Sequence, residues 1–357
     1  MEAVAVNAFW ANKKVLVTGH TGFKGGWLSL WLQQLGADVR GYALPASTTP
    51  AFWQVCNLGS HVPGELADIA EAPALTRAIQ AFAPDIVLHL AAQPLVRESY
   101  RNPALTYATN VMGTVNMLEA VRQSPGVRAV VVVTTDKCYE NREWAWPYRE
   151  NDALGGFDPY SNSKACVELI CASYRDSFFC GSGVALATAR AGNVIGGGDW
   201  SPERLLPDVL RAWQNGEEVV LRYPQATRPW QHVLEPLMGY LMLAEALHRD
   251  GNQHARAWNF GPDGNSVASV ETVVNALAQL WPHPVRWRVD PAVQPHEARL
   301  LALDSSQARQ WLGWQPRWSL GESLQRTLDW HIASQEGHDM YTFTRGQIAN
   351  YQGQTHE

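Results

Sequence analysis

Cysteine is scarce in this 357-residue sequence, and its few thiols form no recognisable pair. The five cysteines are odd in number, and no two of them stand in a Cys-x-x-Cys arrangement. This pattern argues against a disulfide framework and against a zinc site, so we expect no metal. A set of free thiols fits a reducing compartment, which predicts a cytoplasmic protein. The cysteines are Cys56, Cys138, Cys166, Cys171 and Cys180.

Long apolar runs and an excess of positive charge are also missing. No uninterrupted apolar stretch approaches the roughly 20 residues of a membrane-spanning helix, and residues 1–12 lack the basic start and apolar run of a secretory signal. The 28 basic side chains are outnumbered by 34 acidic ones, which gives a formal net charge of −6. A nucleic-acid surface would need clustered basic residues. We therefore expect neither a membrane nor a nucleic acid as a partner.

Two kinds of apolar pattern alternate over the first 190 residues of the sequence. Short runs rich in Val, Ile and Leu are typical of strands buried on both faces, and segments with helical apolar spacing stand between them. This alternation predicts an α/β fold with a Rossmann-type, doubly wound parallel sheet. The expected strands are Val15–Val17, Val39–Ala43, Ile86–Leu90, Val127–Val133 and Val184–Thr188. The expected helices are Trp27–Leu35, Ala72–Phe82, Pro103–Val121 and Pro159–Phe179.

A glycine-rich turn follows the first expected strand. Gly19, Gly22 and Gly25 are spaced Gly-x-x-Gly-x-x-Gly, which differs by one residue from the Gly-x-Gly-x-x-Gly fingerprint of dinucleotide-binding proteins. Glycines let the backbone turn tightly and approach a pyrophosphate, whose charge is stabilised by the exposed N–H groups of the next helix. The position between a strand and a helix therefore predicts a dinucleotide site.

The residue that usually selects NAD is absent. An acidic side chain about 20 positions after the glycine turn normally binds the adenosine ribose, but no Asp or Glu lies between Val39 and Gly64. Arg40 in that region could favour the 2′-phosphate of NADP. Asp68 could lie at the adenine edge of the site or be a solvated loop carboxylate. We expect NAD as the cofactor, and the motif leaves NADP open.

The composition of the sequence changes after Arg190, where a glycine-rich loop is followed by shorter elements with more Pro and Trp. We therefore expect residues 10–190 to form the NAD-binding Rossmann domain, together with a returning segment at about 228–255. The remainder of 191–335 should form a second, smaller α/β substrate-binding lobe. The polar residues 336–357 should form a loosely held tail.

A tyrosine and a lysine stand one helical turn apart at Tyr160 and Lys164. At this spacing both side chains share one face of a helix, and a nearby positive charge lowers the pKa of a phenol toward the range of a useful base. Such a pair can remove the proton from a substrate hydroxyl. Together with the glycine turn upstream, the pair resembles the signature of the extended short-chain dehydrogenase/reductase family.

Three polar residues follow the apolar run that ends at Val133. Thr135, Asp136 and Lys137 place a hydroxyl, a carboxyl and an amine side by side, and ligands of open α/β sheets bind at the carboxyl ends of strands. A nucleotide-sugar 4-epimerase or reductase would need only the hydroxyl and Tyr160. An adjacent acid and base indicate a reaction that also moves a proton from carbon and expels an oxygen. A polar turn that merely caps the strand, and a non-catalytic dinucleotide sensor, stay open as alternatives.

The segment from Lys13 to His331 resembles the nucleotide-sugar 4,6-dehydratases of this family. Members that act on thymidine-diphosphate sugars carry Thr-Asp-Glu at the cluster, and members that act on CDP-glucose carry Thr-Asp-Lys, as this sequence does. The resemblance implies conversion of CDP-glucose to its 4-dehydro-6-deoxy product, a precursor of deoxysugars in lipopolysaccharide. Other matching stretches are His89–Gln93, Tyr107–Asn110, Ala189–Asn193 and Arg228–His232.

The resemblance also implies a role for each residue of the cluster. Tyr160, aided by Lys164 and hydrogen-bonded to Thr135, removes the proton of the 4-hydroxyl while NAD takes the hydride from carbon 4. Asp136 then acts as the acid and Lys137 as the base in the elimination across carbons 5 and 6. The hydride returns to carbon 6, so the cofactor ends as it began and should stay bound.

Further contacts are carried over from the family by position. Arginine side chains match the geometry of phosphates. Helices like those around 103–121 and 159–179 pair in the family into an intermolecular four-helix bundle, so a homodimer or a dimer of dimers is expected. The implied substrate-binding residues are Gln93, Asn193, Arg204, Arg228, Asn259 and Arg299. The implied cofactor-binding residues are Gly19, Thr21, Gly22, Phe23, Lys24, Gly25, Asp68, Leu90, Ala91, Ala92 and Thr109, together with Tyr160 and Lys164.

Overall fold

A seven-stranded parallel sheet lies at the centre of the computed structural model, which describes residues 8–292 and 300–353. The strand order is β11-β6-β5-β4-β1-β2-β3, and every neighbouring pair runs parallel. The chain starts near the middle of the sheet and winds first to one edge and then to the other, which confirms the doubly wound α/β fold. The strands are β1 Lys14–Thr18, β2 Asp38–Ala43, β3 Gly64–Leu66, β4 Ile86–His89, β5 Ala129–Val133, β6 Ala185–Ala191 and β11 Ala257–Phe260.

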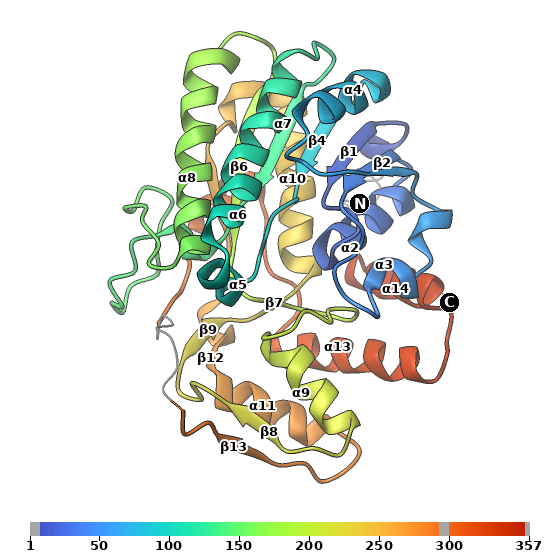
Figure 1. Cartoon of the computed structure of the whole chain (residues 1–357), viewed down its shortest axis with the longest axis vertical. Coiled ribbons are helices and arrows are strands. Elements are labelled where there is room, and N and C mark those ends of the chain that lie inside the picture. The colour runs from blue at the N-terminus through green and yellow to red at the C-terminus, as the bar shows by residue number, and fades with distance from the viewer. Residues whose placement is uncertain (1–7, 293–299, 354–357) are drawn as a thin grey trace.

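Helices cover both faces of the sheet (Figure 1). One face carries α4 Ala72–Phe82, α7 Gly113–Arg122 and α8 Pro159–Tyr174, and the other carries α2 Phe23–Gln34 and α10 Leu234–Asp250. Successive side chains of a strand point to opposite faces, so Val15 and Val17 pack with α2 and α10 whereas Leu16 packs with α4, α7 and α8. Because both faces are covered, every residue of β4 and β5 is buried, which explains their continuous apolar sequences.

Shorter elements complete the first domain. The helix expected over Pro103–Val121 is built as α6, a π-helical turn and α7, and the helix expected over Pro159–Phe179 is built as α8 and a second π-helical turn. The additional elements are α3 Phe52–Val55, α5 Val96–Arg101, α6 Pro103–Tyr107, the π-helical turns Ala108–Met112 and Arg175–Phe179, and the 3-10 turns Leu58–Ser60, Asp136–Cys138 and Gly251–Gln253. Across residues 8–292 and 300–353, no helix combines the length and the apolarity needed to span a bilayer.

The expected second, smaller α/β lobe is built around two helices, α9 Leu205–Gln214 and α11 Val270–Leu280, which pack with α13 Leu320–Gln335. Its core contains Leu210, Leu277 and Leu324. Three two-stranded sheets surround this core, and the lobe lies below the main sheet in Figure 1. The paired strands are β7 Val194–Ile195 with β10 Gln231–His232, β9 Thr227–Pro229 with β12 Val267–Ser269, and β8 Val219–Leu221 with β13 Trp287–Val289.

The seventh strand of the main sheet was not expected. β11 pairs in parallel with β6 at the edge of the sheet, so the segment that returns to the first domain extends beyond residue 255. The strand reads Ala-Trp-Asn-Phe and is only four residues long. A polar residue in so short a run hides it from a search for continuous apolar strands.

The expectation of a loosely held C-terminal tail is wrong for residues 340–351. This segment forms α14 Met340–Tyr351, which packs against α2 and α13. Met340, Ile348 and Tyr351 are buried in the same core as Trp31. Their spacing places them on one face of the helix, so the polar composition of the segment reflects only its other face. The remaining elements are α12 Ser306–Leu312 and the 3-10 turn Gly264–Ser266.

Candidate active site

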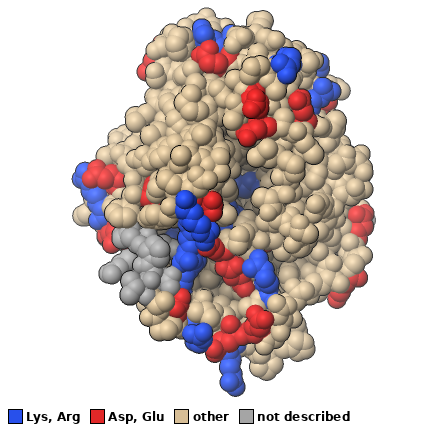
Figure 2. Space-filling view, viewed as in Figure 1, with Lys and Arg blue, Asp and Glu red and all other residues tan. Residues whose placement is uncertain are grey.

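A cavity of about 970 Å³ opens between the carboxyl ends of the sheet strands and the second lobe. Figure 2 shows the molecule hollowed at this place, with a basic side chain deep inside the hollow. The walls come from the glycine turn, the ends of β2, β4 and β5, the start of α8, and the region around α9 and β8. Ligands of open α/β sheets bind at this edge, and the volume lies at the upper end of the range for small-molecule sites.

Close backbone contacts shape the glycine turn. Gly19 has a φ of +77°, and a Cβ at this position would lie 2.7 Å from the backbone nitrogen of Ala91. A Cβ at Gly25 would overlap the carbonyl group of Gly19. The Gly22 N–H donates to the Gly19 carbonyl oxygen at 3.1 Å, and α2 begins at the next residue. The first N–H groups of α2 therefore lie against a bare backbone turn, which fits a pyrophosphate.

The structure brings all the residues that we assigned to the cofactor to this one cavity. They line its wall from the glycine turn, past the ends of β2 and β4, to the π-helical turn that carries Thr109. The Thr21 hydroxyl donates to the carbonyl oxygen of Leu44 at 2.8 Å and so fixes the glycine turn to the end of β2. Asp68 adds one carboxylate, which accepts the N–H of Ala70 at 2.9 Å. This continuous wall fits an extended dinucleotide.

The cation that would have favoured NADP faces away from the cavity. The Arg40 guanidinium lies over the ring of Phe82, 4.6 Å from its centroid. The segment after β2 instead lines the cavity with Leu44, Ser47 and Thr48. Hydroxyl groups can hydrogen-bond a ribose, but they carry no charge to balance a 2′-phosphate. The residues present therefore fit NAD better than NADP.

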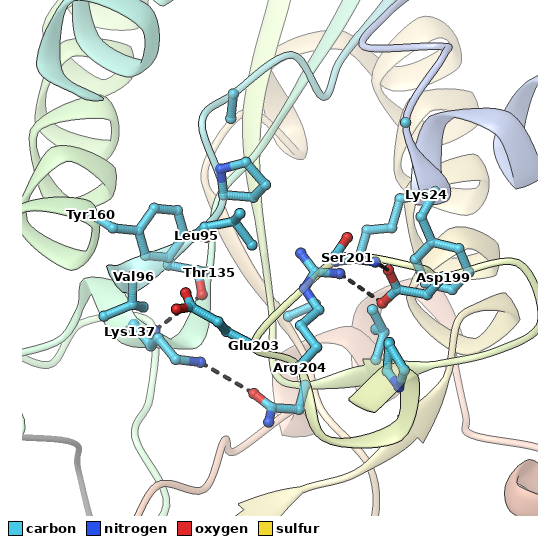
Figure 3. Close-up of a pocket in the computed structure, with 18 of the residues that line it drawn as sticks. Lys24, Leu95, Val96, Thr135, Lys137, Tyr160, Asp199, Ser201, Glu203 and Arg204 are labelled. Atoms are coloured by element: carbon cyan, nitrogen blue, oxygen red, sulfur yellow. Dashed lines mark hydrogen bonds and ion pairs between the residues drawn. The ribbon is translucent and has the colours of Figure 1, made fainter. Parts of the chain in front are cut away.

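Basic side chains converge inside the cavity. Burial and the neighbouring Arg204 lower the pKa of Lys24 to about 7. Arg204 itself donates to Asp199 Oδ2 at 3.0 Å. Figure 3 shows Lys24, Asp199 and Arg204 facing Tyr160 and Lys137 across the cavity. Such a concentration of positive charge suits a ligand with several phosphates. The described residues contain no group of three His, Cys, Asp or Glu side chains placed to hold a metal ion.

The polar cluster after β5 is held together by its own hydrogen bonds. Asp136 is fully buried, and its Oδ1 accepts the Thr135 hydroxyl at 3.0 Å and the Lys137 ammonium at 3.3 Å. The second oxygen, Oδ2, is buried without a partner among the described residues and lies behind Gly192. Lys137 and Thr135 line the cavity. The structure therefore joins the predicted acid to the predicted base, with the acid behind the cavity wall.

Tyr160 and Lys164 project from the first two turns of α8. The helix begins after Asp158, whose carboxylate accepts the Ser161 N–H at 2.9 Å. Burial raises the pKa of Tyr160 to about 12, whereas a hydrogen bond with Thr135 and the charge of Arg204 lower it. Lys164 donates to the carbonyl oxygen of Val133 at 3.0 Å, and burial lowers its pKa to about 8. We expected Lys164 to be the cation that acts on the phenol, whereas the positive charge that lowers the pKa of Tyr160 in the structure is that of Arg204.

Three of the residues that we assigned to the substrate line the cavity, namely Asn193, Arg204 and Arg228. The Asn193 Oδ1 accepts a hydrogen bond from the Lys137 ammonium at 3.2 Å. Arg228 is largely buried, and its guanidinium donates to the carbonyl oxygen of Thr227 at 2.8 Å. Arg299, the remaining arginine of that set, lies outside the described residues.

The other two residues of that set, Gln93 and Asn259, hold the protein together instead. The Gln93 amide donates to the Thr106 hydroxyl at 2.8 Å and accepts the Leu95 N–H at 2.5 Å, which fixes the loop after β4. Asn259 is fully buried, and its Oδ1 accepts the Tyr139 hydroxyl at 2.7 Å. Neither side chain is part of the cavity wall, so the structure does not bring these two residues to the site with Asn193, Arg204 and Arg228.

The cavity also contains charged residues that the sequence analysis did not identify. Arg97, Glu203 and Arg222 line it. Arg97 lies 4.0 Å from the Glu203 carboxylate, and Arg222 donates to the Glu203 carbonyl oxygen at 3.1 Å. Arg222 directly follows β8, so its place after the end of a strand was the signal that could have revealed it.

The chain is similar over most of its length to known dehydratases. A family model described as GDP-mannose 4,6 dehydratase matches residues 16–327. The CDP-glucose 4,6-dehydratase of Salmonella typhimurium (strain LT2) is 50% identical over 352 residues, which cover 97% of this chain and 98% of that protein. The dTDP-glucose 4,6-dehydratase of Streptomyces antibioticus is 30% identical over 331 residues, which cover 89% of this chain and 92% of that protein.

Solved structures of epimerases and dehydratases share the fold. The UDP-glucose-4-epimerase of Stenotrophomonas maltophila with bound NAD and formylated UDP-arabinopyranose superimposes with a TM-score of 0.80 at 23% identity, covering 91% of this chain and 100% of that chain. The dTDP-glucose 4,6-dehydratase of Bacillus anthracis in complex with NAD has a TM-score of 0.74 at 21% identity, covering 91% of this chain and 98% of that chain. At these identities the similarity establishes a common fold.

Proposed function

Because the chain belongs to the GDP-mannose 4,6 dehydratase family, we propose that it is a nucleotide-sugar 4,6-dehydratase whose substrate is CDP-glucose. The reaction removes one water and leaves CDP-4-dehydro-6-deoxy-D-glucose. The observation that carries this proposal is the contact between Asp136 and Lys137 next to Thr135, in the site that also holds Tyr160. The 50% identity to a CDP-glucose 4,6-dehydratase supports the cytidine nucleotide.

Tyr160 is the base of the oxidation. Its phenol is buried, and the Thr135 hydrogen bond and the charge of Arg204 oppose the effect of burial on its pKa. Both neighbours thereby favour the phenolate that takes the proton from the 4-hydroxyl of the sugar. The glycine turn would hold NAD, which would supply the hydride-transfer chemistry between carbon 4 and carbon 6 of the sugar. Lys164 is fixed to β5 through the carbonyl oxygen of Val133.

Lys137 and Asp136 carry out the elimination. A ketone at carbon 4 acidifies the proton on carbon 5, and the Lys137 amine removes that proton and returns a proton to carbon 5 when hydride is added to carbon 6. The 6-hydroxyl leaves as water after it receives a proton from Asp136. Asp136 is buried behind Lys137 and Thr135, so this proton reaches the sugar through one of these two neighbours. The Lys137 Nζ and the Asp136 Oδ1 are only 3.3 Å apart.

The same geometry argues against a 4-epimerase. An epimerase on this fold oxidises and reduces carbon 4, for which Tyr160 and Thr135 are sufficient. It has no step in which a proton leaves carbon 5 or an oxygen leaves carbon 6. A buried carboxyl joined to a lysine that lines the cavity costs desolvation free energy, and only an elimination gives this arrangement a use.

The diphosphate of the substrate is bound by arginines of the second lobe. Arg204 and Arg228 line the cavity, and guanidinium groups match the geometry of phosphate oxygens. The catalytic cluster lies on the sheet side of the cavity, so a nucleotide sugar bound to these arginines extends its base toward α9 and β8. We place the cytosine in that part of the second lobe.

We further propose that the protein is a homodimer built through helices α5 to α8. These helices contact one another, and α6, α7 and α8 lie side by side on one flank in Figure 1. Large exposed apolar side chains on one flank of a protein mark an interaction surface. Two copies joined there form a four-helix bundle, and a dimer of dimers is the alternative. The exposed residues are Tyr100, Leu105, Met112, Leu169 and Phe178.

We place the reaction in the cytoplasm, as one step in the supply of deoxysugars for lipopolysaccharide. All five cysteines are free thiols in the structure, which fits a reducing compartment. A 4-keto-6-deoxy sugar nucleotide is a reactive carbonyl compound, and further deoxygenation, reduction or amination at the ring consumes it.

A mass-spectrometric screen of nucleoside-diphosphate hexoses tests the proposed function. The protein is incubated with NAD and with CDP-, dTDP-, UDP- or GDP-glucose in turn, and each product is examined for the loss of one water. We expect CDP-glucose to lose water fastest, and we expect the Tyr160→Phe variant to leave it unchanged. Formation of the 4-epimer without a change in mass would establish an epimerase instead.

A further inference from the structure

A buried glutamate on α8 links the two halves of the catalytic machinery. Glu168 stands one helical turn after Lys164 and two turns after Tyr160, so the three side chains share one face of the helix. Its side chain is only 3% exposed and lies outside the cavity wall. None of the steps derived above uses this carboxylate.

The Glu168 carboxylate ties three elements together. Its Oε1 accepts the Thr134 hydroxyl at 2.5 Å, and its Oε2 accepts the Thr188 hydroxyl at 2.6 Å and the Arg190 guanidinium at 2.8 Å. Thr134 directly precedes Thr135 at the end of β5, whereas Thr188 and Arg190 belong to β6. One side chain of α8, the helix that carries Tyr160, thus holds the end of β5. The turn that carries Thr135, Asp136 and Lys137 begins there.

Arg190 extends the network to the other end of that turn. Its guanidinium donates to the Tyr139 hydroxyl at 2.7 Å and to the carbonyl oxygen of Glu150 at 3.0 Å. Tyr139 in turn donates to Asn259 at 2.7 Å. Because Tyr139 follows the turn directly and Thr134 precedes it, the turn that carries Asp136 and Lys137 is anchored on both sides to Glu168.

Burying the Glu168–Arg190 ion pair and its hydrogen-bond partners costs desolvation free energy. A buried ion pair loses much hydration, and apolar residues of the same volume are often as stabilising or more so. Stability alone therefore gives a weak reason for placing these charges there. Resting on the proposed function, we propose that Glu168 is a positioning residue. It fixes Tyr160 and Lys164 against the turn of Thr135, Asp136 and Lys137, so that oxidation at carbon 4 and elimination across carbons 5 and 6 act on one bound sugar.

The Glu168→Gln variant tests this proposal, because it keeps the shape of the side chain and loses the charge that holds Arg190. We expect kcat for CDP-glucose to fall about 100-fold, since a small misplacement of reacting groups has an effect of that order. KM should stay nearly unchanged, because the arginines of the second lobe that bind the diphosphate do not touch the network. Thr188→Val should lower kcat about tenfold, and Thr188→Ser, which restores the hydroxyl, should recover it.

Glu235→Gln is the matched control. Glu235 is also a fully buried carboxylate, and it accepts the N–H groups of Arg317 and Trp318 and the Tyr351 hydroxyl, outside the cavity wall. This variant should lower Tm and leave kcat unchanged. If Glu168→Gln does not fold, the comparison of Thr188→Val with Thr188→Ser decides the question.

The outcomes separate this inference from the proposed function. If the unmodified protein does not dehydrate CDP-glucose, the proposed function fails, and the variants are not needed. If it does, folded Glu168→Gln or Thr188→Val protein with an unchanged kcat would overturn the positioning role. An equal loss of kcat in Glu168→Gln and in Glu235→Gln at an equal fall in Tm would also overturn it.

Discussion

Among single residues, Tyr160 is a catalytic group whose acidity depends strongly on its neighbours. Burial raises its pKa to about 12, and the Thr135 hydrogen bond and the Arg204 charge act in the opposite direction. A general base must be deprotonated for part of the time at the working pH. Arg204 therefore has an electrostatic effect on the phenol in addition to its proposed contact with the diphosphate.

Replacing Arg204 with methionine should raise the pKa of Tyr160, because a positive charge near the phenolate is lost. In the pH profile of kcat, the limb that rises as Tyr160 loses its proton should move to higher pH. At neutral pH, kcat should fall roughly tenfold or more. The measurement is a pH profile of kcat at saturating CDP-glucose. Arg204→Lys keeps the charge and should retain a profile close to that of the unmodified protein. An unchanged limb in Arg204→Met would contradict the role of Arg204.

Replacing Lys137 with glutamine should separate the two halves of the reaction. Tyr160 and Thr135 are untouched, so carbon 4 is still oxidised, but no amine remains to remove the proton from carbon 5. Elimination should slow by about 10²- to 10⁴-fold, the usual contribution of a general base. Rapid-quench analysis of a single turnover should find the 4-ketone with its 6-hydroxyl still present. Elimination at the normal rate would show that another group is the base.

The residues that the sequence analysis expected to be catalytic lie together in the structure, whereas only some of the expected substrate-binding residues reach the cavity. Distance along the chain explains the difference. Tyr160 and Lys164 form a local helical pair, and the catalytic turn directly follows an apolar strand. Asn259, by contrast, accepts a hydrogen bond from Tyr139, which lies 120 residues away in the sequence. Such a partner cannot be inferred from local spacing. The effect of Arg204 on Tyr160 likewise depends on how the second lobe packs against the first.

The elements of the first domain are joined by buried polar side chains, of which His89 is an example. It stands at the end of β4, and its ring nitrogens hydrogen-bond to Thr18 of β1 at 2.7 Å and to Thr114 of α7 at 3.1 Å. Burial lowers the pKa of His89 to about 3. The ring is therefore neutral in the folded protein throughout the range in which an unfolded histidine takes up a proton.

This shift makes the stability of the protein dependent on pH. The pKa of His89 is lower in the folded state than its ordinary value of 6.5, so the unfolded chain binds more protons below pH 6.5. The stabilisation is complete above that pH and is lost as the pH falls toward the folded value. One such histidine contributes a slope of up to about 1.4 kcal/mol per pH unit. Urea unfolding between pH 7 and about pH 4.5 should show this decline.

The slope of the unfolding free energy against pH should become shallower in His89→Gln. It should not reach zero, because burial also lowers the pKa of His20 to about 4 and that of His232 to about 3. The exposed His283 supplies the control, and His283→Gln should keep the full slope. An equal slope in His89→Gln and in the unmodified protein would contradict the account.

Elements with a strong local pattern were predictable, and elements defined by their partners were not. β4 and β5 are buried on both faces, and apart from His89 at the end of β4 they consist of apolar residues, so their sequences alone identify them as strands. β11 is only four residues long and contains Asn259, and it is a strand because β6 pairs with it. α14 is polar on average, and only its packing against α2 reveals which face is apolar.

The charge of the whole molecule has the opposite sign to the charge of its cavity. The chain carries a formal net charge of −6, but eight Lys and Arg side chains and six Asp and Glu side chains line the site, so the site has a small excess of positive charge. An excess of one sign in a cleft with low-dielectric walls concentrates ligands of the other sign. Net charge could not indicate that the cavity suits phosphates, because that depends on where the chain places its cations.

Replacing Leu169 with aspartate should break the proposed dimer. Leu169 is 60% exposed on α8 in the single chain, and a charge at the centre of an apolar interface would have to be buried without a partner. Light scattering coupled to size-exclusion chromatography should find a dimer or tetramer for the unmodified protein and a smaller species for the variant. Val289→Asp is the control, since Val289 is 51% exposed on β13 in the second lobe, and the assembly should be unaffected. A monomeric unmodified protein would contradict the proposal.

The transfer of a label within one sugar molecule tests most directly whether a single site oxidises, dehydrates and reduces its substrate. CDP-glucose that carries deuterium at carbon 4 is mixed with CDP-glucose that carries no deuterium but is enriched in ¹³C. The mixture is converted in ordinary water, and the products are analysed by NMR and mass spectrometry. We expect the deuterium to reappear at carbon 6 of the same molecule. Deuterium lost to the solvent, or found on the ¹³C-enriched product, would contradict it.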